Sequence, residues 1–170
     1  EKVTIKSSVV NDLTQKGASL SGFLVEDEVT LKDLAYAIVL VSGGDAALLA
    51  AEYVSDSEAT FVNKMNELAN QIGMINTHFA NAIGLDNSNH YSTVEDLNKF
   101  MNIALKNTDF AELVTTLSYQ TNATNYLTEG YYLESTLLRD PVNLALKQGE
   151  ILGGKTGFTD QAGLCLISIA

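Results

Sequence analysis

The sequence predicts one α+β domain in which a mainly helical region is inserted between sheet segments from the two ends of the chain, and we expect these sheet segments to meet in space. Apolar residues recur at helical spacing through the middle of the 170-residue chain, whereas β-branched and aromatic residues gather near both ends. Hydrophobic residues make up 46% of the chain and charged residues 18%, so the chain can bury a core. We divide the domain into a sheet-side segment over 1–29, a mainly helical region over 30–148, and two strands over 149–170.

The first part of the chain is expected to be extended over 3–5 and 19–25, on either side of the break at Gly17. The first helix is expected to begin after Thr30, because a threonine hydroxyl can cap a helix and Asp33 stands three residues later. The spacing of apolar residues then continues this helix as far as 41.

Glycines and capping residues divide the helical region further. Residues 42–44, Ser-Gly-Gly, interrupt the helical pattern, and Asp45 is expected to start a second helix. Asp56 or Ser57 is expected to cap a third helix, and Gly73 stands where a left-handed residue would end it.

The remainder of the chain moves from helix back to sheet. Ser92 and Glu95 predict a capping box for a fourth helix, and Thr108 is expected to start a short fifth one. Residues 117–132 are typical of strand or loop. Residues 152–170 predict strand, turn and strand, and the apolar run 164–169 is typical of a buried strand.

Composition excludes several classes of function. The net charge of −11 argues against a nucleic-acid partner and against a polybasic membrane surface. No apolar run is long enough to span a membrane. The one cysteine, Cys165, excludes an internal disulfide and a thiolate zinc site, and we expect it to be a small core residue. His78 and His90 have no ligand partners at metal spacing, so we expect structural hydrogen bonds there and neither a metal nor a cofactor.

Two interpretations compete for the glycine-rich segment near the end of the chain. Residues 149–156 satisfy the phosphate-loop pattern, but 142–147 do not form an apolar strand before it and no helix is expected after it. The second interpretation makes Lys155-Thr156-Gly157 an edge-strand motif. Lysine supplies a positive charge, threonine a hydroxyl for a carboxylate, and glycine room for a substrate backbone. The second interpretation explains more of the segment.

Taken together and in order, several segments resemble the low-molecular-weight penicillin-binding proteins, the serine D-alanyl-D-alanine carboxypeptidases of the peptidase S11 family. Each segment alone is also typical of an ordinary capped turn or loop, so the joint order carries the resemblance. The matching segments are 30–34, 41–43, 76–79, 84–86, 90–93 and 155–159.

The resemblance implies a fold and a set of roles. The fold is a partial penicillin-binding protein or β-lactamase-like fold, whose site lies where helices meet sheet. Ser42 would help to move a proton toward the leaving amine, and Lys155 would provide positive charge over the substrate carboxylate. Thr156 would bind that carboxylate, and Gly157 with Phe158 would line the strand where the peptide lies. We therefore expect Ser42 and Lys155 to face each other across a groove.

Two departures from the family pattern bear on activity. The family's nucleophile stands in a Ser-x-x-Lys turn, yet no lysine here whose third preceding residue lies within the chain has serine at that position. Gly44 occupies the substrate-binding position where the family has asparagine, so one amide is missing. Ile83 also differs from the polar residue often found before Gly-Leu. The chain begins at Glu1 and stops inside an apolar run, so we expect a piece of a longer protein, and we expect this piece to be inactive.

The implied activity is hydrolysis of peptidoglycan stem peptides that end in D-Ala-D-Ala, outside the bacterial cytoplasm. β-Lactams would acylate the intact protein. An alternative is a module that binds cell-wall peptide without turnover, which Gly44 favours. A β-lactamase relative would need a deacylating glutamate, and Glu95 is expected to serve a helix cap instead.

Overall fold

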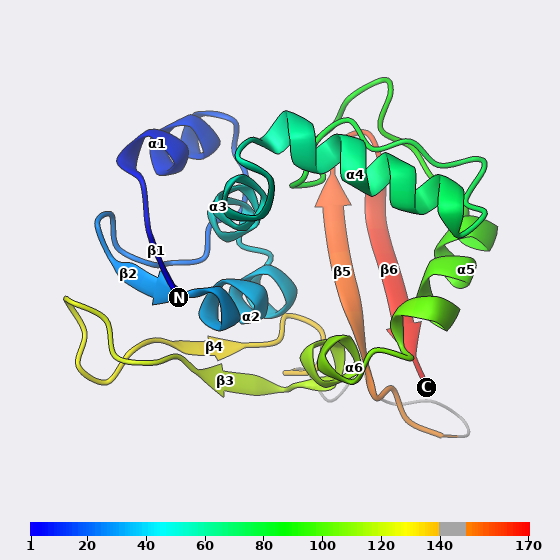
Figure 1. Ribbon diagram of the computed structural model, residues 1–170. Coiled ribbons are helices and arrows are strands. Elements are labelled where there is room, and N and C mark those ends of the chain that lie inside the picture. Colours follow the sequence, from blue (N-terminus) through cyan, green and yellow to red (C-terminus); the bar gives the residue numbers. More distant parts are fainter. Residues whose placement is uncertain (140–148) are drawn as a thin grey trace.

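The computed structural model describes residues 1–139 and 149–170. Its elements follow the order β1, α1, β2, α2, α3, α4, α5, α6, β3, β4, β5, β6 along the chain (Figure 1). The helices are α1 (Ser7–Gln15), α2 (Leu31–Val41), α3 (Gly44–Ser55), α4 (Glu58–Gln71), α5 (Val94–Ala104) and α6 (Thr108–Thr115). The strands are β1 (Lys2–Thr4), β2 (Glu28–Thr30), β3 (Ser118–Gln120), β4 (Tyr132–Glu134), β5 (Gly153–Thr159) and β6 (Gly163–Ile169).

The strands pair in sequence as three antiparallel pairs, β1 with β2, β3 with β4, and β5 with β6. Figure 1 shows β1 and β2 at one end of the molecule and the long β5–β6 hairpin at the other, with α2 and α3 between them. The expectation that sheet segments from the two ends of the chain meet is therefore wrong for the described residues, although the α+β class is confirmed. The strand, turn and strand expected over 152–170 are confirmed as this hairpin.

Helix α2 is the centre of the core, because it packs on α3, on α6 and on strand β4. The capping box predicted at its start is confirmed: the Thr30 hydroxyl accepts from the Asp33 backbone N–H, and the Asp33 carboxylate accepts from the Thr30 N–H. Leu34 and Leu40 on this helix are 0% and 1% exposed. The other buried apolar side chains of this cluster come from the residue that follows β1 and from α1, β2, α3 and β4, and they include Ile5, Leu13, Val29, Leu49 and Leu133.

Asp33 also connects the start of α2 to the β3 region. It is 1% exposed, and its carboxylate accepts from the Tyr119 hydroxyl at 3.0 Å and from the Asn122 backbone N–H at 3.2 Å. Burial acts to raise the pKa of Asp33, but hydrogen bonds from Thr30 and Asn122 outweigh burial and hold this pKa below its usual range. Burial and the bond to Asp33 raise the pKa of Tyr119 to about 12. The ring of Tyr119 stacks on Tyr36 of α2, with centroids 3.7 Å apart.

Several local expectations differ from the structure. Residues 19–25 form no strand, and helix α1 occupies part of the segment assigned to the sheet side. Asp45 does not cap α3; its buried carboxylate accepts instead from the backbone N–H and hydroxyl of Ser21, at 2.7 and 2.6 Å. The cap of α5 is Thr93, which accepts from the Asp96 N–H, while the Ser92 hydroxyl bonds Thr77 at 2.8 Å.

The apolar run in β6 is not buried. Leu164 and Leu166 are 91% and 58% exposed, and Cys165 is exposed, so the expected core role of this cysteine is wrong. The reason is topological, because β6 pairs only with β5 among the described residues and neither face of the hairpin is fully covered.

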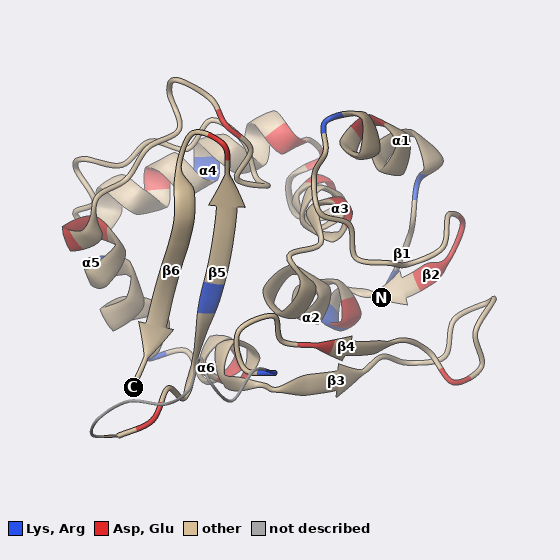
Figure 2. Cartoon of the chain, turned by 180° about the vertical axis from the view of Figure 1, so that it is seen from behind, with Lys and Arg blue, Asp and Glu red and all other residues tan. Residues whose placement is uncertain are grey.

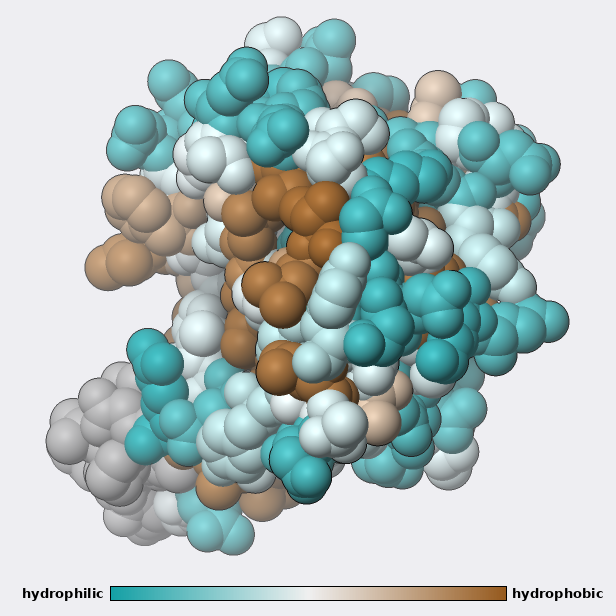
Figure 3. All heavy atoms as spheres, turned by 90° about the vertical axis from the view of Figure 1, so that its left-hand side faces the viewer, coloured by the Kyte–Doolittle hydropathy of each residue, from teal (hydrophilic) through white to brown (hydrophobic). Residues whose placement is uncertain are grey.

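The surface is acidic without a single acidic face. Figure 2 shows aspartate and glutamate spread over several helices and loops. Figure 3 looks onto the end of the molecule opposite the hairpin, where hydrophobic surface in the middle is surrounded by hydrophilic side chains. Within 1–139 and 149–170, no helix combines the length and the apolarity that crossing a membrane requires.

Candidate active site

Ser42 lies at the sharp turn that ends α2. Its backbone has φ 58° and ψ 38°, the left-handed conformation, which non-glycine residues adopt rarely and at a cost of about 1–3 kcal/mol. The turn is closed by backbone hydrogen bonds to the Ala37 carbonyl, one of them from the Gly43 N–H at 3.0 Å. The fold therefore holds a half-buried serine hydroxyl at the carboxyl end of a buried helix.

The glycines after Ser42 allow another part of the backbone to approach. A Cβ at Gly43 would lie 2.9 Å from the Ser21 Cβ, and a Cβ at Gly44 would lie 3.1 Å from the Ser19 carbonyl oxygen. The Gly44 N–H donates to that same carbonyl at 2.8 Å. Together with the Asp45–Ser21 bonds, these contacts fix the 18–21 loop against the turn. An asparagine in place of Gly44 would require the Ser19 carbonyl to move by a few tenths of an ångström.

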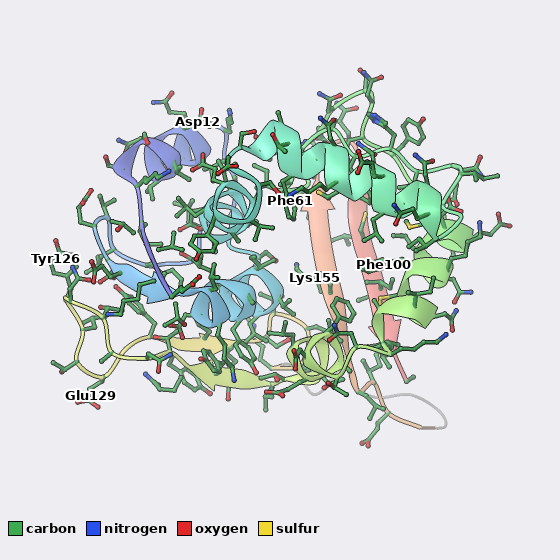
Figure 4. All side chains as sticks on the ribbon, in the orientation of Figure 1. Asp12, Phe61, Phe100, Tyr126, Glu129 and Lys155 are labelled. Atoms are coloured by element: carbon green, nitrogen blue, oxygen red, sulfur yellow. The ribbon has the colours of Figure 1, made fainter. Side chains whose placement is uncertain are left out.

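Lys155 faces Ser42 from strand β5. Its ammonium donates to the Ser42 hydroxyl oxygen, and it also donates to the Thr156 carbonyl at 2.6 Å. Figure 4 shows Lys155 in the space between β5 and α2. Burial lowers the pKa of Lys155, because removal from water disfavours the charged form. The predicted approach of Ser42 and Lys155 is therefore found in the structure.

Glycines also set the position of β5. A Cβ at Gly153 would lie 2.2 Å from the Val114 carbonyl oxygen of α6, and a Cβ at Gly154 would lie 2.2 Å from the Ile167 carbonyl oxygen of β6. No other residue type allows so close an approach. The start of β5 therefore rests directly on the end of α6, two residues before Lys155.

A cleft of about 760 Å³ lies between the end of α2, residues 17–19, residues 82–86 and strand β5. Every site residue predicted from the sequence lines this cleft: Ser42, Gly44, Lys155, Thr156, Gly157 and Phe158. Phe158 is 66% exposed, so its ring stands at the rim. The volume is in the range of sites that bind small molecules or peptide ends. The roles assigned to these residues remain predictions.

Several cleft residues were not predicted as site residues, and Thr136, Ser19 and His90 are among them. Thr136, between β4 and the undescribed segment, places its hydroxyl 3.0 Å from the Thr156 hydroxyl. Ser19 reaches the cleft from the loop beneath Gly44. His90 also lines the cleft, and its ring nitrogen accepts from the Ala80 N–H at 3.3 Å. Burial, with a smaller effect of His78, lowers the pKa of His90 and favours the neutral ring. No motif marked Thr136 or Ser19, because single hydroxyl residues in loops carry no pattern.

The phosphate-loop alternative does not fit the local structure. The chain continues after Thr156 as strand β5 and then turns into β6, so no helix N-terminus follows the lysine. The preceding segment 142–147, which we used against this alternative, lies outside the described residues. Glu95 is an exposed residue in the first turn of α5 and is neither a cap nor part of the cleft lining.

The fold and the cleft define a class of proteins in which a serine hydroxyl at a helix end meets a lysine on an edge strand. The sequence model of the family described as peptidase S11, D-alanyl-D-alanine carboxypeptidase, matches residues 1–170. The chain belongs to this family.

Named relatives and solved structures support this family assignment. The chain is 33% identical to the D-alanyl-D-alanine carboxypeptidase of Streptomyces sp. (strain K15), over 99% of this chain and 60% of that protein. It is 31% identical to the D-alanyl-D-alanine carboxypeptidase DacF of Bacillus subtilis (strain 168), over 100% of this chain and 43% of that protein. The crystal structure of the Streptomyces K15 DD-transpeptidase matches with a TM-score of 0.85 at 30% identity, over 99% of this chain and 66% of that chain. The chain thus spans 60% or less of these curated relatives.

Proposed function

We propose that the full-length protein containing this chain is a serine D-alanyl-D-alanine carboxypeptidase. It removes the terminal D-alanine from peptidoglycan stem peptides, outside the bacterial cytoplasm. One observation carries the proposal: the Lys155 ammonium donates to the Ser42 hydroxyl inside a cleft whose edge is Thr156-Gly157. Family membership supplies the reaction class.

The cleft suits a peptide that ends in a carboxylate. The half-buried Lys155 ammonium provides positive charge, and the Thr156 hydroxyl can donate a hydrogen bond. Gly157 is exposed and has no side chain, so a substrate backbone can lie against β5 there. In our proposal, the terminal carboxylate lies next to Lys155 and the preceding peptide lies along the strand.

The reaction forms and breaks an acyl-enzyme. A serine oxygen attacks the carbonyl carbon of the penultimate D-alanine, and the bond from this carbon to the terminal nitrogen breaks. The leaving amine gains a proton, which the Ser42 hydroxyl relays in our proposal. Water then hydrolyses the ester and restores the serine. The attacking serine belongs to a Ser-x-x-Lys turn that the 170 residues do not show, so we propose that this chain alone is inactive.

The test uses two samples. The full-length protein should release D-alanine from an N-acylated peptide ending in D-Ala-D-Ala and should gain the mass of a labelled β-lactam. The 170-residue chain should gain no covalent adduct. A stable adduct on the shorter chain would overturn the proposed inactivity, while a full-length protein that neither releases D-alanine nor is acylated would overturn the enzyme assignment.

A binding module without turnover is the second candidate, and Gly44 favours it. Glycine supplies no amide for the substrate, and a lost hydrogen bond of this kind is worth about 0.5–1.5 kcal/mol. The Ser19 carbonyl lies where a larger residue at this position would need room. Binding of the D-Ala-D-Ala peptide by the full-length protein without release of D-alanine would support this module over the enzyme.

A further inference from the structure

Two threonine hydroxyls from distant parts of the chain meet in the cleft. Thr136 Oγ1 lies 3.0 Å from Thr156 Oγ1, and both residues line the cleft wall. A hydroxyl both donates and accepts, so either oxygen can be the donor in this pair. Thr136 is half-buried and belongs to the turn that follows β4, outside every motif that the sequence marks.

The turn that carries Thr136 is held in place from several sides. The Thr136 backbone N–H donates to the Leu40 carbonyl at 3.0 Å, two residues before Ser42. The preceding Ser135 N–H donates to the Leu117 carbonyl at 2.8 Å, and the Ser135 hydroxyl accepts from the Leu138 N–H at 3.1 Å. Leu138 is 9% exposed, so the turn is also packed. The Thr136 hydroxyl is thereby fixed between the end of α2 and β5.

We propose that Thr136 is a positioning residue for recognition of the substrate carboxylate. This inference rests on the proposed function. A carboxylate only accepts hydrogen bonds, so Thr156 must donate its proton to it. The Thr156 oxygen is then free to accept, and the Thr136 hydroxyl stands at the distance to donate to it. The resulting chain runs from Thr136 to Thr156 to the carboxylate, and each bond polarises the next.

The experiment removes the Thr136 hydroxyl while keeping its shape. Full-length Thr136→Val is assayed on a D-Ala-D-Ala peptide and on the same peptide with a C-terminal amide. We expect kcat/KM for the carboxylate form to fall about 3–10-fold, mainly through KM, and kcat/KM for the amide to change less than about 2-fold. Thr136→Ser, which restores the hydroxyl, should recover most of the loss. Thr14→Val removes a matched hydroxyl on α1 and should change neither value.

A double-mutant cycle tests the route through Thr156. Because Thr136 acts only by way of the Thr156 hydroxyl, Thr136→Val should add almost no further loss in a Thr156→Val background. Losses that multiply, an equal loss on both peptides, or a Thr136→Ser variant as poor as Thr136→Val would overturn the proposal. Thermal unfolding checks that each variant folds, and Thr136→Ala replaces the valine variant if that one does not.

A second readout separates this inference from the proposed function. A peptide analogue with a reduced scissile amide cannot be hydrolysed, and its affinity with and without the carboxylate is measured by calorimetry. Thr136→Val should weaken only the carboxylate form, whether or not the protein turns over its substrate. Absence of D-alanine release from the wild-type protein counts against the enzyme alone, and an unchanged carboxylate preference in the variant counts against Thr136.

Discussion

The packed region around α2 differs from the β5–β6 hairpin in how far it buries its apolar side chains, although both contain leucines. Leu34 and Leu40 of α2 are 0% and 1% exposed, whereas Leu164 and Leu166 of β6 are 91% and 58% exposed. The region around α2 is surrounded by packed helices and short strands, while β6 pairs only with β5 among the described residues. The cleft lies where these two regions meet.

This difference shows how each wall of the cleft is positioned. Hydrophobic packing sets the wall that carries Ser42. The hairpin wall is set by close backbone approach at its start and by polar contacts along its length. The contacts join Lys155 to Ser42, Thr156 to Thr136, and Thr159 to Asp86, the last at 2.6 Å. The residues that hold the hairpin are therefore largely the residues proposed to bind substrate.

Matched leucine truncations in the two regions should give the largest difference. We expect Leu34→Ala to lower the free energy of unfolding by about 2–5 kcal/mol, because it leaves a cavity in a packed core. Leu166→Ala should cost less than about 1 kcal/mol, since its side chain is mostly in water. Urea unfolding of the 170-residue chain measures both values. Equal losses would mean that the hairpin is packed as tightly as the region around α2.

Local sequence signals predicted local structure well and burial poorly. The Thr30–Asp33 capping box and the cap at Ser57 follow from side chains that bond their own helix. Ser92 and Thr93 offer the same chemistry one residue apart, and only the distant Thr77 shows which of them is free to cap. Exposure of Cys165 depends on which elements cover β6, and the strand's own composition does not contain that information.

The residues of the candidate site also divide into those that the sequence could predict and those that only the fold reveals. Ser42 and Lys155 could be brought together from the ordered motifs of a known family, although they are far apart in the chain. Thr136 could not, because it lies outside the segments that resemble the family and meets Thr156 only through a tertiary contact. The sequence alone could not explain why position 44 is glycine, since the carbonyl that limits the space at this position belongs to Ser19.

Glycine substitutions test the close approach that places the hairpin. Gly153→Ala should destabilise the chain by about 1–3 kcal/mol, because its Cβ would overlap the Val114 carbonyl and force β5 away from α6. Gly157→Ala on the same strand is the matched control for stability, since its Cβ would meet only the Cys165 Cβ at 3.7 Å. Urea unfolding compares the two. A smaller loss for Gly153→Ala than for Gly157→Ala would contradict a hairpin placed by backbone contact.

A substitution of Asp33 tests the buried hydrogen bonds at the start of α2. Asp33→Asn should lower the free energy of unfolding by about 1–2 kcal/mol at pH 7, because an amide leaves some of the surrounding buried donors without an acceptor. The folded-state pKa of Asp33 is below its usual range. Its contribution is therefore complete above about pH 4 and is lost as pH falls through the folded pKa, so the two proteins should converge in acid. The exposed Asp109→Asn is the control and should change little.

Lys155 gives the smallest and most specific effect, a pH dependence at the junction of the two regions. Burial places its pKa below the usual lysine value of about 10.4. In our proposal the charged ammonium binds the substrate carboxylate, so kcat/KM of the full-length protein should fall as pH rises through this lowered pKa. The free energy of unfolding should change in the opposite direction and rise with pH. The unfolded chain keeps the lysine proton to higher pH than the folded chain, so the Lys155 contribution to the free energy of unfolding rises across the same interval. Lys155→Arg, whose guanidinium stays charged, should lower activity at all pH values and remove the alkaline decline. A decline that persists in this variant would assign the titration to another group.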